Sequence, residues 1–306
     1  MFKASWPGVC RLASVSFMTF VSLAAADRVC AQPADLIGIR AQGMGGAFTA
    51  VADDATAPWW NPAGMAGGAL FGGIVEYGHP EKPAGTEVKG ISMTFPALGL
   101  SYYRLPVSQM RLPATTEQLA AGREDQGTLS QFGATVGQSI GNHLVLASTL
   151  KLLKASNTHV DLDLGAMVTF GRVRGGITLK NATKPTFGSG ADLLTLERQV
   201  RAGVALTTGT RGVIGTATVA ADADLRTVTT IDGDERRVAA GAEAWTKNKV
   251  LGVRGGVNTN TVGERNAALS GGVSAAIRKG TYVDLQTTGG SEKARHGWGI
   301  ALRVTF

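Results

Sequence analysis

Cysteine is nearly absent from this sequence, which has two, Cys10 and Cys30, in 306 residues. Both lie within the first 31 residues, a segment with the features of a cleaved signal peptide. We therefore expect a mature chain with no disulfide bond, no thiolate metal site and no cysteine nucleophile. Charged residues are also scarce, at 17% against about 25% in ordinary proteins. They are scattered along the chain, so a nucleic-acid-binding surface is a poor interpretation of the net charge of +7.

Long hydrophobic runs are missing as well. No stretch of the chain reaches about 18 consecutive apolar residues, which excludes a helical membrane protein. The N-terminus carries Lys3 and Arg11, followed by an apolar run over residues 12–26 that is too short to cross a bilayer. This pattern predicts a secretory signal peptide. Cleavage fits after Ala26 or after Ala31, and we favour Ala31, which assigns residues 1–31 to the signal peptide.

The remaining composition and pattern are typical of strands. Glycine supplies 42 residues, roughly twice its usual share. From residue 69 onward, apolar residues alternate with small or polar ones along successive segments. The last segment is the clearest, because Trp298, Leu302 and Phe306 fall on one face and Arg303 on the other. One face suits lipid and the other suits a polar lumen.

The two aromatic residues of that segment mark the edges of an apolar band. Trp298 and Phe306 are about 26 Å apart along a strand, or about 20 Å in height at a tilt of roughly 40°, close to the usual band of ~25 Å. The terminal Phe306 also resembles the C-terminal signal by which outer-membrane proteins are recognised for insertion. We therefore predict that Trp298 and Phe306 form an insertion signal for the barrel-assembly machinery.

The alternation predicts fourteen strands. Short and long connections alternate between them, apart from a short turn at 156–157, as expected where both ends of a barrel face the periplasm. The longest connection, 106–127, is predicted as a loop with a helical turn or two. A soluble sandwich would show the same alternation, but the signal peptide, Phe306 and the lack of cysteine favour lipid. The predicted strands are 69–78, 86–95, 97–105, 128–140, 143–155, 158–170, 172–181, 193–207, 212–225, 235–246, 248–258, 265–278, 281–288 and 294–306.

One long segment, from Gly38 to Gly64, does not alternate: GIRAQGMGGAFTAVADDATAPWWNPAG. The spacing GMGGAFxAVADDA followed by WNPAG resembles the N-terminal signature of the FadL-like superfamily of outer-membrane barrels, and is most similar to the PorV/PorQ branch. The resemblance implies a plug folded inside a 14-stranded barrel. The expected fold is thus an all-β, antiparallel transmembrane β-barrel with a small N-terminal plug. The expected parts are the signal peptide 1–31, the plug 32–67 and the barrel 68–306.

Within the plug, three groups of residues are candidates for a functional site. Asp53 and Asp54 are expected to cap a short helix or to pair with arginines of the lumen, because a buried charge needs a partner. A second interpretation gives them a cation or an acid/base role. Trp59 and Trp60 are expected to pack the plug against the wall, or to line an apolar ligand path. The candidate arginines are Arg174, Arg201, Arg254 and Arg303.

The third group is the tripeptide Asn61, Pro62 and Ala63, which matches the corresponding tripeptide of FadL-type plugs. The resemblance implies that these residues lie near the wall where apolar substrate leaves sideways. Enzymatic interpretations are weaker. His159 and Asp161 share a predicted face near the outer edge, which weakly resembles a barrel-protease arrangement, but no serine joins them. We expect no catalytic residue, no cofactor and no metal.

Two functions remain open. The first is a FadL-like outer-membrane channel for passive uptake of an apolar or amphipathic small molecule. The second, implied by the PorV/PorQ resemblance, is an accessory barrel of the type IX secretion system that binds a protein partner. Either would lie in the outer membrane of a Gram-negative bacterium, in contact with its lipid.

Overall fold

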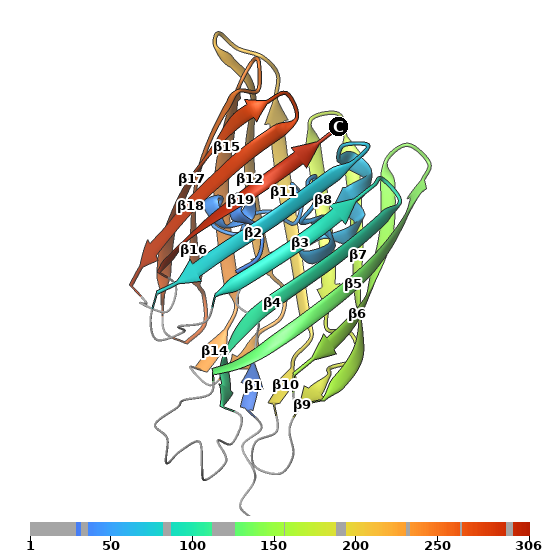
Figure 1. Ribbon diagram of the computed structural model, residues 1–306, viewed down its shortest axis with the longest axis vertical. Coiled ribbons are helices and arrows are strands. Elements are labelled where there is room, and N and C mark those ends of the chain that lie inside the picture. Colours follow the sequence, from blue (N-terminus) through green and yellow to red (C-terminus); the bar gives the residue numbers. More distant parts are fainter. Residues whose placement is uncertain are drawn as a thin grey trace, which may run out of the picture.

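In the computed structural model, fourteen antiparallel strands close into a barrel, as predicted (Figure 1). The structure describes residues 29–31, 36–81, 87–111, 126–155, 157–187, 194–230, 233–263, 265–291 and 296–306. In ring order the strands are β11 (Gln199–Thr208), β12 (Ile214–Asp224), β15 (Arg237–Thr246), β16 (Leu251–Asn260), β17 (Ala267–Arg278), β18 (Thr281–Gly290), β19 (Gly297–Thr305), β2 (Gly72–Pro80), β3 (Val88–Thr94), β4 (Leu98–Arg111), β5 (Gln126–Ile140), β6 (Leu144–Lys154), β7 (Thr158–Phe170) and β8 (Val173–Lys180).

β19, the last strand of the chain, pairs with β2, the first strand of the barrel, and closes the ring, with Ile300 opposite Tyr77. Closure matters because hydrocarbon cannot satisfy the backbone groups of an open edge. No helix among the described residues is both long and apolar enough to cross a membrane.

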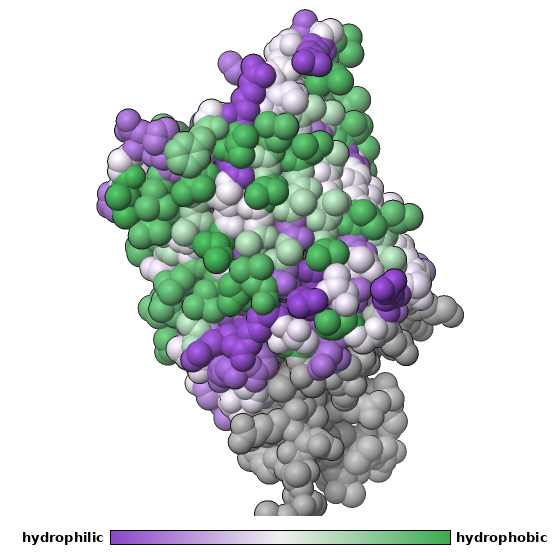
Figure 2. Space-filling view, turned by 180° about the vertical axis from the view of Figure 1, so that it is seen from behind, coloured by the Kyte–Doolittle hydropathy of each residue, from purple (hydrophilic) through white to green (hydrophobic). Residues whose placement is uncertain are grey.

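The alternation sorts side chains between lipid and lumen, as predicted. Leu302 is 46% exposed on the outer face, whereas Arg303 is 6% exposed and faces the lumen. Apolar side chains cover much of the middle of the wall in Figure 2, and hydrophilic ones gather toward its two ends. Trp298 and Phe306 both point outward. Phe306 stacks on Phe71 with ring centroids 6.4 Å apart, at the edge where the chain ends.

Connection lengths orient the barrel. Tight turns such as residues 141–143 and 279–280 lie at the edge where the chain ends, and the longer connections lie at the opposite edge. Since outer-membrane barrels have short periplasmic turns and long outer loops, we call these the inner and outer edges. The connection between β6 and β7 is the short outer connection that the sequence predicted.

Three predicted boundaries were wrong. Residues 106–111, predicted as loop, continue β4, and residues 112–125, with the predicted helical turn, lie outside the described part. The strand predicted at 193–207 begins at Gln199, since β10 (Leu194–Leu196) pairs with β9 (Thr186–Phe187) outside the ring. The predicted loop 226–234 contains most of a hairpin of β13 (Val228–Thr230) and β14 (Gly233–Glu235). Alternation continues through residues 193–198 although this segment leaves the ring, so periodicity alone could not find the start of β11.

The segment before the plug is described only in part. Residues 1–28 and 32–35 lie outside the described residues, and with them most of the predicted signal peptide. Its last three residues form β1 (Val29–Ala31), which pairs in parallel with β10 near the outer edge.

Candidate functional site

The candidate site is the plug, residues 36–68, which lies inside the ring of strands (Figure 1). From Ile37 to Met65, all residues except Gln42, Gly46 and Asp53 are buried. Its helices are α1 (Ile39–Gly43), α2 (Ala57–Trp60) and the 3₁₀ helix η1 (Pro62–Gly67). α1 contacts β16 to β19, whereas η1 contacts β5 to β7 on the opposite side of the ring.

Glycine and proline keep these helices short. Gly38 precedes α1 with φ of 82°, and Gly45 and Gly46 follow it with φ of 69° and 82°, a region that other residues seldom adopt. Pro58 and Pro62 lie at the starts of α2 and η1, where a missing N–H costs little. The plug is therefore a chain of tight turns rather than one helix.

The first half of the plug, residues 36–54, is held to the wall by charged groups, and we call it the charged half. The carboxylate of Glu76 on β2 accepts hydrogen bonds from the backbone N–H groups of Gly38 at 3.0 Å and Ile39 at 3.2 Å. Arg40 donates to Glu243 of β15, with Nη2 2.6 Å from Oε2. These contacts satisfy the free N–H groups at the start of α1 and fix it against two separate parts of the wall.

Arg40 also organises the two predicted aspartates. Its Nη1 lies 2.5 Å from Asp53 Oδ1 and 3.3 Å from Asp54 Oδ2. Asp53 additionally pairs with Arg174 at 3.3 Å. Burial by itself raises the pKa of Asp53, but the charges of Arg40 and Arg174 outweigh burial and lower the pKa below its usual range. Asp54 accepts from the backbone N–H and the hydroxyl of Thr56, the residue before α2, and no side-chain hydrogen bond caps that helix.

The other predicted arginines bind carboxylates of the wall. Arg254 lies 3.3 Å from Glu243, Arg303 lies 2.8 Å from Asp284, and Ser274 bonds both Arg254 and Asp284. Arg201 pairs with Asp224, away from the plug aspartates. An alternating chain of cations and carboxylates therefore runs from Arg174 through the plug to Arg303.

The middle of the charged half contacts β11, β12, β15 and β16. Asp222 Oδ2 accepts from the N–H groups of Phe48 at 2.9 Å and Thr49 at 2.8 Å, and Asn258 Nδ2 donates to Gly45 at 3.0 Å. A Cβ on Gly241 would overlap the carbonyl of Met44. Glycine on the wall thus lets the plug backbone approach the strands directly.

The second half, residues 55–68, carries no charge and we call it the neutral half. Trp59 is 6% exposed and packs edge-on against Tyr103 of β4, with ring centroids 5.6 Å apart. Trp60 is 1% exposed and donates from Nε1 to Ile37 at 3.1 Å. Lys180 of β8 lies over both indole rings. The tryptophans therefore join the plug to the wall rather than standing free in a channel.

Asn61, Pro62 and Ala63 lie against β6, β7 and β8. Asn61 Nδ2 donates to Thr49 within the plug at 2.9 Å and to the backbone of Ala166 on β7 at 3.1 Å. Pro62 packs over Gly165 of β7, where a Cβ would lie 2.8 Å from its ring. Ala63 belongs to a small apolar cluster with Ala147 and Met167. The tripeptide is thus a second contact between the neutral half and the wall, beside that of the tryptophans.

The lumen differs on the two sides of the plug. Toward the outer edge, fully buried apolar side chains join the plug tryptophans in one cluster. They are Tyr103, Leu105, Leu129, Leu153, Phe187 and Leu196. Toward the inner edge lies a chamber of about 430 Å³, lined by Arg40, Arg174, Arg303, Glu243 and threonines. Buried Lys151, Asp161 and Asp163 lie among these apolar side chains, so the lumen is mixed outside the plug and polar inside it.

The weak protease-like pair does not form. Asp161 bonds Lys151 of β6 at 2.7 Å and Thr183, whereas His159 packs edge-on against Phe187. Within the described residues, no group of three or more His, Cys, Asp or Glu side chains is placed to hold a metal ion.

Several residues of the site were not found from the sequence. Arg40 could have been, because it is the nearest cation to the aspartate pair and lies in the same segment. Glu76, Asp222 and Glu243 gave no signal, since each is one polar residue in an alternating strand. Only the ring brings them to the plug.

Comparison with known proteins gives the fold a context. Neither a protein-family model nor a curated protein matches the sequence. Among solved structures, the Ralstonia pickettii toluene transporter TbuX is similar, with 11% identity, a TM-score of 0.60, and coverage of 89% of this chain and 99% of that one. The P. putida toluene transporter TodX follows with 12% identity, a TM-score of 0.53, and coverage of 89% and 99%.

A Pseudomonas aeruginosa FadL homologue is similar as well, with 9% identity, a TM-score of 0.52, and coverage of 87% of this chain and 97% of that one. At such identities the likeness concerns the fold. The similar structures are FadL-family outer-membrane barrels, and nothing in the comparisons confirms the PorV/PorQ branch. The chain has the fold of a FadL-type outer-membrane barrel.

Proposed function

We propose that this chain is a passive outer-membrane channel for a small apolar or amphipathic molecule. The observation that carries the proposal is the cluster of buried apolar side chains on the outer side of the plug, where Leu105, Leu129 and Leu153 join the plug tryptophans. A water-filled porin has a polar interior instead. The similar barrels described as toluene transporters support the same class of solute.

The route of the solute follows from the two halves of the plug. If the charged half left the wall, ion pairs such as that of Arg40 with Glu243 would break. Each buried charge would then lack a partner, which is costly. The neutral half is held by packing and by single hydrogen bonds such as that from Asn61 to Ala166. We therefore place solute passage between the neutral half and β5 to β8.

Release into the inner chamber is favoured over sideways release. Gly67 and Gly68, at the end of η1, line that chamber, so a shift of η1 would join it to the apolar cluster on the outer side of the plug. The ladders of β7 with β6 and with β8 are unbroken, and a sideways exit there would have to open one of them.

Uptake by whole cells tests this function. Cells of a Gram-negative host that lacks its own hydrocarbon channel should take up radiolabelled toluene several times faster when they make this protein. Uptake of a hydrophilic solute of similar size serves as the control and should stay at the level of the empty host. A gain in hydrophilic uptake with none for toluene would contradict the proposal.

The alternative is the type IX accessory barrel, which would bind a protein partner through its outer edge. Genes for secretion components beside this one, together with unchanged toluene uptake, would favour it. Recognition of Phe306 by the barrel-assembly machinery remains a prediction under both functions.

A further inference from the structure

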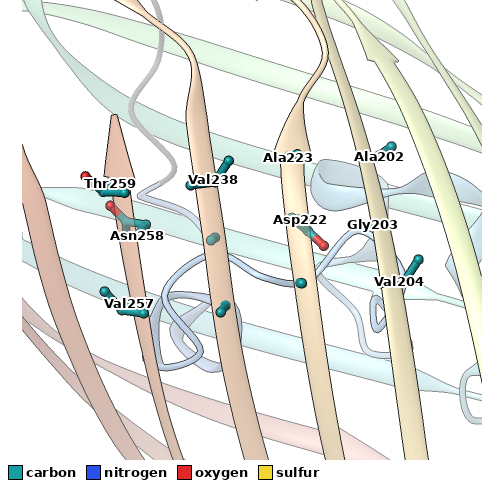
Figure 3. A pocket seen from close by; sticks show the side chains of 12 residues that line it. Ala202, Gly203, Val204, Asp222, Ala223, Val238, Val257, Asn258 and Thr259 are labelled. Carbon is teal, nitrogen blue, oxygen red and sulfur yellow. The ribbon is translucent and has the colours of Figure 1, made fainter. Parts of the chain in front are cut away.

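The lipid-facing wall has a hollow of about 540 Å³ that the proposed function does not use (Figure 3). It extends across β11, β12, β15 and β16, and its surface is almost entirely apolar. The outward-facing residues on these strands are small, including Ala221, Ala223 and Ala240, and valines border them. Val204 is 60% exposed and Val257 is 40% exposed. The hollow therefore opens toward lipid.

The hollow is closed on its inner side. The ladders that join the four strands are unbroken along it. Behind them lies the plug, as Figure 3 shows, bonded through Asp222 to Phe48 and Thr49 and through Asn258 to Gly45. A solute in the lumen cannot reach the hollow without breaking both the ladders and these bonds. Its occupant must come from the membrane.

Exposed arginines follow at the outer ends of the same wall. Arg236 shares the outward face with Val238 and lies two residues beyond it, about 7 Å along the strand. Its Nε donates to Thr261 at 3.1 Å, which holds the guanidinium over the end of β16. Arg198 precedes β11 and Arg265 precedes β17, each on the outward side by alternation and each exposed. Among the described residues, no carboxylate lies within ion-pair distance of these three arginines.

An apolar hollow below three exposed guanidinium groups suits a ligand with a hydrocarbon chain and an anionic headgroup. Hydrocarbon in the hollow would regain the dispersion contacts that its walls otherwise lack. Guanidinium groups bind phosphate through paired N–H donors, and a basic residue near an anionic membrane surface contributes about 1 kcal/mol, which is about fivefold in affinity. The hollow and the arginines lie in the half of the barrel nearest the outer edge, which faces the outer leaflet.

We propose that this wall binds an anionic lipid of the outer leaflet, with an acyl chain in the hollow and a headgroup phosphate on Arg236, while Arg198 and Arg265 lie two strands away on either side. The lipid would cover the part of the wall where Gly241 on the inside and alanines on the outside leave little more than backbone between plug and membrane.

Lipid titration of the intact barrel tests the proposal. The detergent-extracted protein, freed of bound lipid, is titrated with lipid A and observed by native mass spectrometry, with a neutral phosphatidylcholine for comparison. One lipid A should bind in preference to the neutral lipid. Arg236→Ala should weaken binding about fivefold. Ala221→Phe, which fills the hollow, should weaken it about tenfold, equivalent to two methylene groups that no longer fit.

Matched variants elsewhere on the wall serve as controls. Arg104→Ala removes an exposed outward arginine of β4, and Ala275→Phe enlarges an exposed outward alanine of β17 outside the hollow. Both should bind lipid A as the unmodified protein does. Ala221→Leu replaces Ala221→Phe if the larger residue prevents closure of the barrel. Equal binding by all variants, or equal loss in the controls, would overturn the proposal. So would unchanged lipid binding combined with slower toluene uptake by Ala221→Phe, which would make the hollow a solute exit.

Discussion

The two halves of the plug are held in place by different physics. The charged half has Arg40 bonded to Glu243 and both aspartates, and Glu76 bonded to the start of α1. The neutral half has indole packing and single hydrogen bonds, and the bonds from Asn61 to Ala166 and from Thr178 to Trp60 join it to the wall. A buried ion pair is costly to break because the remaining charge has no partner, whereas apolar packing can re-form around a guest of similar chemistry. The difference suggests one fixed half and one yielding half.

Deleting residues 36–64 should have the largest effect, because it removes both halves together. The wall closes through its own ladders, so the barrel should still fold and should then conduct ions far better in a planar bilayer. Circular dichroism and heat-modifiable migration check that the barrel has formed. Unchanged conductance in a folded deletion would mean that the segment does not block the lumen.

Arg40→Met should release the charged half alone. It leaves Glu243, Asp53 and Asp54 short of a cation, and breaking such a buried pair typically costs about 3–5 kcal/mol. Single-channel recordings should show frequent opening events that the unmodified protein lacks. Arg237→Met is the control, since it breaks an ion pair with Glu235 away from the plug. Silent recordings for Arg40→Met would show that this half does not depend on its charges.

Asn61→Ala should loosen the neutral half without opening an ion path. The change removes donors to Thr49 and Ala166 and strands buried carbonyls, at about 1–3 kcal/mol. Toluene uptake should rise severalfold while conductance stays low. Asn258→Ala removes a comparable amide contact to the charged half, at Gly45, and should leave toluene uptake unchanged. Similar uptake by both variants would remove the distinction between the halves.

Thr178→Val should have the smallest effect. The hydroxyl of Thr178 on β8 donates to the carbonyl of Trp60 at 3.2 Å, and valine keeps the shape while losing that bond. The loss is about 1 kcal/mol, so toluene uptake should rise by at most about fivefold. A larger change than that of Asn61→Ala would indicate that β8 rather than β7 holds the neutral half.

The barrel was predictable because its period is enforced in every strand by lipid outside and the lumen inside. Leu302 and Arg303 fell on the predicted faces, and fourteen strands were found. The strand ends were not predictable at β10, where alternation continues although the segment leaves the ring. Periodicity reports which way a side chain points and not which strand lies beside it.

The plug's partners were predictable only where they are local. The segment itself stands out by its lack of alternation, and Arg174 was one of four arginines expected near the aspartates. Glu76 and Glu243 lie 38 and 203 residues from the groups they bind, so their roles depend on closure of the ring. The wall residues that bind the charged half are therefore determined by tertiary structure and not by local sequence pattern.

Cross-linking each half to the wall tests the central claim, passage beside the neutral half, most directly. In a Cys30→Ser background, Ala63→Cys with Ala147→Cys ties the neutral half to β6, and Ile39→Cys with Ala301→Cys ties the charged half to β19. Each pair comes from one small apolar cluster that joins plug and wall. Oxidation of the first pair should abolish toluene uptake and a reductant should restore it, whereas oxidation of the second should leave uptake unchanged. Full uptake with the neutral half tied, or its loss only with the charged half tied, would contradict the account.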